Sequence, residues 1–162
     1  MAADLWIPYF SAVASVAAAL TGLVFVAVSI NLAPIVKQVW LTDRAAESLM
    51  QLMGAAIVAT LALIPRQLGG AFGLETLGAA TLLWLVQTRL QVRYMRARKD
   101  HPLHWATVRI VQTQLAYVPL AVGGVLLAAA QPAGYYWIVP GLTFSLLVGV
   151  ANAWVLLVEI LR

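Results

Sequence analysis

Residues 11–32 read SAVASVAAALTGLVFVAVSINL and contain no charged side chain. An α-helix rises ~1.5 Å per residue, so about 20 such residues cross a hydrocarbon core ~30 Å thick. The first half of the stretch is small: Ala14, Ala18 and Gly22 follow one another at i, i+4 spacing and share a helix face. The stretch therefore predicts a transmembrane helix with a packing surface of small residues, which let a second helix approach closely.

The composition of the whole chain agrees with this prediction. Of its 162 residues, 63% are hydrophobic and only 10% are charged, and the mean hydropathy is +0.91. Soluble domains carry about 25% charged residues, so this chain lacks the polar surface that such a domain needs. The net charge of +4 is explained by basic residues in cytoplasmic loops and does not indicate nucleic acid. The absence of cysteine excludes disulfides and thiolate metal sites.

Four further apolar segments follow the first and are separated by proline, glycine or charged connections. We expect Pro34 to end the first span, and Thr42 or Asp43 to cap the second. The segment before residue 11 lacks the basic start of a secretory signal peptide, so the first span is expected to stay in the protein. The predicted spans cover residues 8–33, 44–65, 73–95, 105–130 and 135–161.

The basic residues assign an orientation to these spans. Every Lys and Arg except Arg66 falls on one side of a five-span arrangement. The positive-inside rule then places the N-terminus outside and the C-terminus in the cytoplasm. Trp6, Tyr9 and Phe10 are expected to form an aromatic belt at the outer interface. The predicted fold class is all-α, a polytopic transmembrane bundle of five helices; a re-entrant segment that leaves four crossings is the alternative.

Polar side chains inside the spans gather toward the cytoplasmic ends. Such groups are costly in lipid and usually face the interior of a bundle. Glu47 and Gln51 share one helix face, and Asn152 and Glu159, seven residues apart, share another. Asn31 is expected to hydrogen-bond into the same layer. The predicted intramembrane polar cluster comprises Asn31, Arg44, Glu47, Gln51, Arg89, Asn152 and Glu159, and the small residues Gly141, Ser145 and Gly149 predict a packing stripe on the last span.

Two interpretations of this cluster remain open. Glu47 and Glu159, together with Arg44 or Arg89, form a cytoplasm-facing pocket for an ion, a proton or a lipid headgroup. Alternatively, the cluster only fixes helix register through interhelical salt bridges and amide hydrogen bonds, which contribute about 0.6–2 kcal/mol each.

A basic strip follows at the end of the third span. Arg89, Arg93 and Arg96 lie on one helical face, and Arg98 and Lys99 come directly after it. Such a strip predicts contact with anionic lipid headgroups, at ~1 kcal/mol per basic residue. Its alternative role is to set membrane topology alone.

Catalytic and metal-binding signatures are absent from the sequence. His101 and His104 are separated by Pro102 and have no third strong ligand nearby, so no metal site is predicted. The sequence contains no HExxH, GxSxG, P-loop or GxGxxG motif. We therefore predict no cofactor and no enzymatic activity.

Four blocks carry a resemblance to a family. They read TGLVFVAVSINL (21–32), RAAESL (44–49), YYWIVPG (135–141) and NAWVLLVEILR (152–162). With these blocks in this order, the chain resembles a group of small, largely uncharacterised bacterial integral membrane proteins. The resemblance implies a five-span protein of the bacterial inner membrane and no catalytic residue. Some such proteins are labelled modulators of a membrane-bound protease, which implies a possible membrane-protein partner.

Two classes of function follow from these features. The first is an interaction or regulatory membrane protein that works by lateral helix and lipid contacts, as a homo-oligomer packed through a small-residue stripe. The second is a small oligomeric ion or proton channel or carrier that uses Glu47 and Glu159. The first class is favoured because the outer half, which carries Thr60, Arg66, Gln67, Glu75 and Thr76, offers no matching charged residues to continue a polar path.

Overall fold

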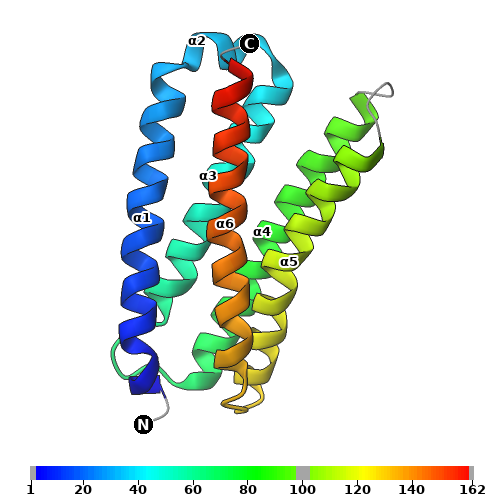
Figure 1. Cartoon of the computed structure of the whole chain (residues 1–162). Coiled ribbons are helices and arrows are strands. Elements are labelled where there is room, and N and C mark those ends of the chain that lie inside the picture. Colours follow the sequence, from blue (N-terminus) through cyan, green and yellow to red (C-terminus); the bar gives the residue numbers. More distant parts are fainter. Residues whose placement is uncertain (1–2, 98–102, 161–162) are drawn as a thin grey trace.

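The structure is a computed structural model that describes residues 3–97 and 103–160, and these residues fold into helices without any strand (Figure 1). A short 3-10 helix, η1 (Ala3–Trp6), leads into α1 (Ile7–Ile30). The chain then continues through α2 (Leu32–Lys37), α3 (Val39–Leu61), α4 (Gly69–Ala97), α5 (Leu103–Ala128) and α6 (Gly134–Ile160).

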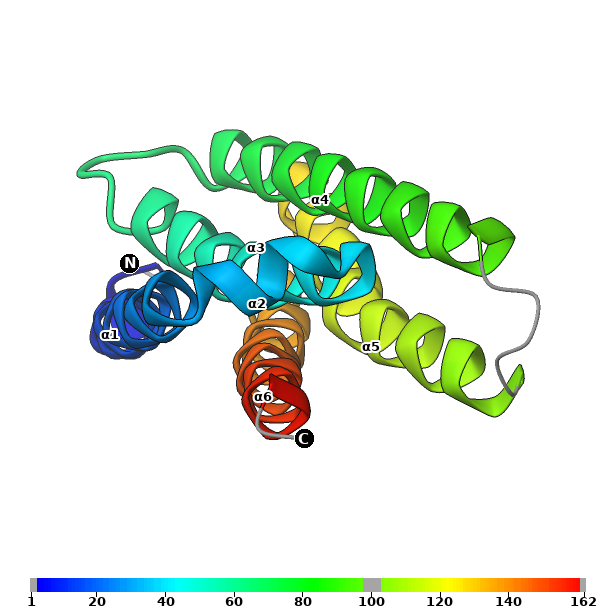
Figure 2. The same cartoon turned by 90° about the horizontal axis from the view of Figure 1, so that it is seen from above.

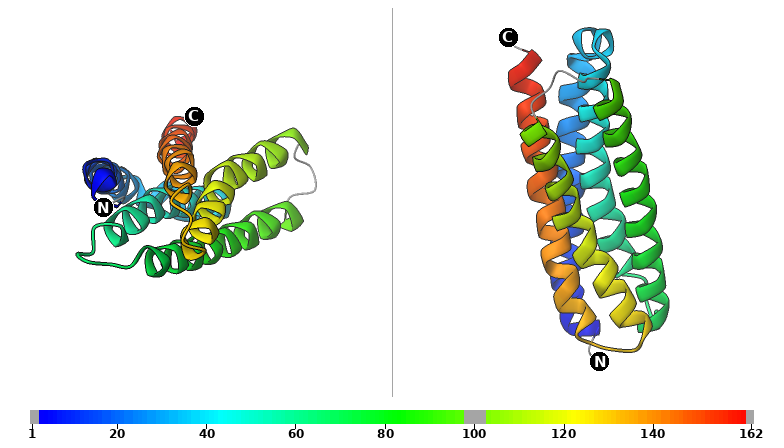
Figure 3. Two further views of the ribbon diagram at one scale, coloured as in Figure 1. Left: turned by 90° about the horizontal axis from the view of Figure 1, so that it is seen from below. Right: turned by 90° about the vertical axis from the view of Figure 1, so that its right-hand side faces the viewer.

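The long helices alternate in direction, so the first and last described residues lie at opposite ends of the molecule (Figure 1). In the view from above, α3 occupies the middle and contacts α1, α4 and α6 (Figure 2). The hairpin of α4 and α5 leans away from α1 toward the upper end in Figure 1, as the further views also show (Figure 3). We name that upper end, which holds Lys37, Arg44, Arg93 and Arg109, the basic end. The opposite end, which holds Trp6, Phe10 and Tyr135, is the aromatic end.

Within residues 3–97 and 103–160, four helices are long and apolar enough to cross a membrane. They are α1, α4 up to Arg93, α5 from Thr107 and α6 up to Val158. Large apolar side chains on these helices point outward; Leu23, Leu82 and Leu147 are all highly exposed. A surface of this kind is favourable in lipid and unfavourable in water. The chain thus has the character of a multi-pass membrane protein.

Helix α3 differs from these four because its first turns carry Asp43, Arg44 and Glu47. All three side chains are buried. Neighbouring helices cover α3 on several sides, so these three side chains face protein and not the surroundings. The predicted second span is therefore a polar central helix.

Several predicted boundaries differ from the structure. Helix α3 ends at Leu61 and α4 begins at Gly69, each four residues before the predicted boundary. Helix α1 ends at Ile30 because Asn31 leaves the helical region (φ −102°, ψ 21°), and Pro34 stands inside α2 where it was expected to stop the first span. Helix α3 begins at Val39, five residues before the predicted start. The Thr42 hydroxyl accordingly does not cap this helix and donates a hydrogen bond to the carbonyl of Ile35 (3.1 Å).

Glycines hold α4, α5 and α6 together at the aromatic end. A Cβ placed on Gly73 would lie 2.7 Å from the carbonyl oxygen of Gly124, and one on Gly123 would lie 2.8 Å from that of Gly134. Only glycine permits backbones to approach this closely. The Gly123–Gly124 pair is therefore a packing surface. From this contact, α4 and α5 lean outward toward the basic end (Figure 1).

Aromatic side chains close the aromatic end. The rings of Trp6 and Tyr135 stack with centroids 5.7 Å apart, and Phe10 meets Phe72 edge-on at 5.7 Å. Aromatic pairs of this geometry add about 0.5–1.5 kcal/mol to the energy of burial. Phe10 is fully buried, so the predicted belt is partly turned inward and joins α1 to α4 and α6.

Candidate functional site

A buried ion pair connects α3 to α5. Arg109 Nη2 lies 2.5 Å from Glu47 Oε1, and the two side chains are 8% and 1% exposed. Two charges this deep are costly to desolvate, and removing one partner leaves the other uncompensated, which costs about 3–5 kcal/mol. The pair therefore constrains how α5 sits against α3.

Gln91 of α4 supports the pair from the other side. Its amide nitrogen donates to Thr113 Oγ1 (2.7 Å) and to the carbonyl oxygen of Arg109 (3.4 Å). The Thr113 hydroxyl in turn donates to the same carbonyl (3.0 Å). These bonds fix the turn of α5 that carries Arg109.

Helix α6 meets α3 in the same layer. The Ser48 hydroxyl donates a 2.7 Å hydrogen bond to the carbonyl oxygen of Gly149. A Cβ on Gly149 would lie 2.7 Å from the Leu52 side chain, and one on Gly141 would lie 2.6 Å from that of Leu120. The stripe of Gly141, Ser145 and Gly149 thus lies where α6 packs on α5 and α3. Asn152, one turn beyond Gly149, is buried.

The rim of this layer at the basic end carries a weaker contact. Arg93 Nη2 lies 4.0 Å from Asp43 Oδ1, with most of the arginine side chain exposed. Exposed pairs at this distance add little to stability. Arg89 is exposed as well. The described part of the predicted lipid-binding strip thus faces outward, whereas the side chain of Arg96, and Arg98 and Lys99 altogether, lie outside the described residues.

The structure separates the members of the predicted polar cluster. Glu47, Gln51, Arg44 and Asn152 are buried on α3 and α6, and Arg89 is not. The side chain of Glu159 lies outside the described residues. The Asn31 amide donates to the carbonyl of Ala27 in its own helix (2.9 Å). That local bond takes the place of the predicted hydrogen bond from Asn31 into the layer, because α1 ends at this residue and leaves its last carbonyls free to accept.

The small-residue stripe of α1 faces away from the bundle. Ala18 and Gly22 are exposed, Ala14 is half-buried, and among the described residues nothing comes within 4 Å of a Cβ built on Gly22. Helix α1 instead buries the face of Phe10, Val13, Ala17 and Val24. The small-residue stripe of α1, which was expected to pack on another helix, is therefore not a packing surface within the described part of the chain.

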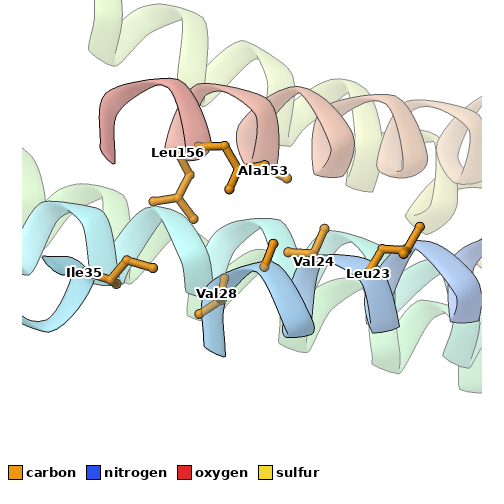
Figure 4. Close-up of a pocket in the computed structure, with 8 residues that line it drawn as sticks. Leu23, Val24, Val28, Ile35, Ala153 and Leu156 are labelled. Atoms are coloured by element: carbon orange, nitrogen blue, oxygen red, sulfur yellow. The ribbon is translucent and has the colours of Figure 1, made fainter. Parts of the chain in front are cut away.

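An apolar pocket lies between α1, α2 and α6 near the basic end (Figure 4). Its volume is about 120 Å³, and the residues that line it are Leu23, Val24, Ala27, Val28, Ile35, Ala153, Leu156 and Leu157. The lining offers no polar group for catalysis. Within the described ranges no three His, Asp or Glu side chains gather in a way that could hold a metal ion.

Comparison with protein-family models, curated proteins and solved structures finds no match. The resemblance to small five-span bacterial membrane proteins therefore stays a prediction. The assignment of the candidate site depends on the geometry of this structure alone.

Sequence reasoning missed the role of Arg109. It assigned Arg44 or Arg89 to Glu47, because Arg44 lies one turn away on the same helix. Depth is the signal that points to Arg109, which pairs directly with Glu47, while Arg44 also acts on this carboxylate through its charge. Arg109 stands six residues into α5 and Glu47 eight residues into α3, and both helices begin at the basic end. An arginine two turns inside an apolar helix needs a counter-charge at its own depth.

Proposed function

We propose that this protein is an integral membrane protein of five membrane-crossing helices, with the N-terminus outside and the basic end in the cytoplasm, and that it acts by lateral contacts and not by catalysis. Its neighbours in this proposal are lipids, a second copy of the chain, and possible further membrane proteins. The resemblance described above supports placement in the bacterial inner membrane.

Helix α3 supplies the fifth crossing in this proposal. Its 23 residues span roughly 34 Å at ~1.5 Å per residue, which matches a hydrocarbon core. Its charged residues do not oppose insertion, because Glu47 is neutralised by Arg109 and both are shielded by neighbouring helices. Five crossings also agree with the opposite positions of the chain ends.

The observation that carries the lateral-contact proposal is the outward face of α1. This helix has the highest mean hydropathy of the four apolar helices, 2.3. Nevertheless, only 17% of the residues in its most apolar stretch are buried inside the bundle, against 44% for α6. Ala18 and Gly22 lie exposed on it. Small residues at i, i+4 spacing let another transmembrane helix approach to backbone distance. A second α1 from another copy fits such a surface.

Exposed basic side chains extend the proposal to lipids. Arg89 and Arg93 point outward at the basic end, where anionic headgroups of the cytoplasmic leaflet lie in this orientation. The contact would orient the bundle and enrich anionic lipid around it.

A channel or carrier is the second candidate, and the buried Glu47–Arg109 pair favours it. Intramembrane charges often mark ion or proton pathways. The packing at the other end opposes a continuous path. Ala55, Leu120 and Leu142 are fully buried between the charged pair and the aromatic end, and the aromatic cluster closes that end.

Disulfide cross-linking in membranes tests the main proposal. Because the chain has no cysteine, Gly22→Cys introduces a single reporter on the α1 stripe. We expect Gly22→Cys to form a cross-linked dimer, and the matched variant Leu82→Cys, on the exposed face of α4, to stay monomeric. Equal cross-linking of both variants would remove the support for an α1 interface. Ion or proton flux through liposomes that is lost in Glu47→Gln would favour the channel.

A further inference from the structure

In the middle of the bundle, four side chains carry polar atoms that have no hydrogen-bond partner in the described part of the chain. They are both amide atoms of Gln51, Oε1 of Gln87, the hydroxyl of Tyr117 and Oγ of Ser145. Each side chain is at most 2% exposed. They come from α3, α4, α5 and α6, one from each helix. We call these four residues the polar core.

The four residues lie on facing sides of their helices. A Cβ on Gly54 would lie 2.7 Å from the Leu83 side chain and 3.9 Å from the Tyr117 hydroxyl. Gly54 is one turn from Gln51, and Leu83 is one turn from Gln87. The polar core thus joins α3, α4 and α5.

Helix α6 contributes from the remaining side. A Cβ on Gly149 would lie 3.5 Å from the Cβ of Gln51, and Ser145 stands one turn further along the same face of α6. The side chain of Ser145 is buried. The four polar groups therefore lie buried inside the bundle, one to two turns deeper than the Glu47–Arg109 pair.

Leaving such groups unpaired is costly. A buried polar group without a partner costs about 1–3 kcal/mol, and more than nine in ten buried polar groups in proteins bond to protein or to ordered water. Gln51 alone brings two donors and an acceptor into the core. An ordered water molecule needs two to four polar partners, which this group of side chains supplies.

We propose that the polar core holds ordered water molecules that hydrogen-bond Gln51, Gln87, Tyr117 and Ser145. The water enters from the basic end, where the charged layer of Glu47 and Arg109 lies directly above the polar core. It stops at the apolar layer on the far side. Ala55 and Leu120 follow Gln51 and Tyr117 by one turn, Leu142 precedes Ser145 by one turn, and all three are fully buried. The proposal concerns the interior of the bundle and is independent of contacts made by α1.

Hydroxyl-radical labelling by X-ray radiolysis tests this on the unmodified protein in lipid nanodiscs. Radicals form from water in place, so a buried aromatic ring is oxidised only where bound water adjoins it. Tyr117 and Phe10 are each 2% exposed. We expect Tyr117 to be oxidised at least ten times faster than Phe10. Equal, slow oxidation of both rings would overturn the proposal.

A pair of variants gives an independent check. Gln51→Leu removes the polar group that offers most hydrogen bonds to the water, whereas Gln112→Leu makes the same change on the half-buried side of α5. We expect Gln51→Leu to lower the oxidation rate of Tyr117 several-fold and Gln112→Leu to leave it unchanged. Unchanged oxidation in Gln51→Leu would show that the polar core does not hold the water.

Discussion

Arg109 of α5 reaches Glu47 of α3 through a 2.5 Å ion pair in the buried interior. The two residues are 62 positions apart in the chain, and each comes from a helix that begins at the basic end. The carbonyl of Arg109 also accepts hydrogen bonds from Gln91 and Thr113. One residue thereby links α3, α4 and α5 at the level where the α4–α5 hairpin leans outward.

Breaking this pair should destabilise the bundle strongly. Either Glu47→Leu or Arg109→Leu leaves a buried charge without its partner, and we expect a loss of about 3–5 kcal/mol in the free energy of unfolding. The double variant removes both charges and should lie closer to the wild type than either single variant. Denaturant titration in mixed micelles measures all four proteins. Losses that simply add in the double variant would contradict a direct pair.

The glycine contacts at the aromatic end should not tolerate a methyl group. A Cβ on Gly124 would lie 2.8 Å from the backbone nitrogen of Leu77 and 2.9 Å from the carbonyl oxygen of Gly73. Since backbone atoms cannot move aside cheaply, Gly124→Ala should cost about 1–3 kcal/mol. The matched change Gly78→Ala meets nothing within 4 Å in the described part of the chain. It should gain about 0.5–1 kcal/mol from helix propensity, so thermal unfolding midpoints of the two variants should move in opposite directions.

Ala130, in the turn between α5 and α6, has a strained backbone conformation that a substitution can relieve. This residue has φ of 58°, in the left-handed region that costs an L-residue roughly 1–2 kcal/mol. The Ala130 and Gln131 amides donate to the carbonyls of Leu127 and Leu126 (2.9 and 2.8 Å), the pattern of a helix end that favours glycine. Ala130→Gly should therefore raise stability by about 1 kcal/mol. Ala129→Gly, one residue earlier, should lower it, and a loss in both variants would refute the strain.

The presence of the long helices can be predicted from the sequence, because each apolar span is long and is bounded by proline, glycine or charged residues. Residues 105–130 and 135–161 were predicted as spans, and the helices run from Leu103 to Ala128 and from Gly134 to Ile160. The start of α3 was misplaced because Thr42 and Asp43 have good capping chemistry. In the structure Asp43 is buried beside Arg93, and the helix extends beyond it to Val39.

The site was harder to predict than the helices because tertiary geometry decides partners. Sequence spacing relates residues only within one helix. It therefore predicted Arg44 as a neighbour of Glu47 and could not predict the contact with Arg109, which lies on another helix. Spacing also could not predict which of the small-residue stripes, that of α1 or that of α6, packs inside the bundle. Gly149 packs on Leu52, whereas Gly22, in an equally regular stripe, faces outward. Whether a small-residue face points into or out of the bundle depends on how α3 packs between its neighbours. A local sequence pattern carries no information about that packing.

The two phenylalanines of α1 should respond very differently to truncation. Phe10 is 2% exposed and contacts Phe72 and Tyr135, whereas Phe25 is 61% exposed on the outer side of the same helix. Phe10→Ala leaves a cavity at the aromatic end and should cost about 3–5 kcal/mol. Phe25→Ala should cost well under about 1 kcal/mol, because its ring contacts lipid or detergent in the folded protein and gains little from burial. Unfolding midpoints in detergent compare the two. Similar losses in detergent-solubilised monomers would contradict the buried position of Phe10 and the outward position of Phe25 in the bundle.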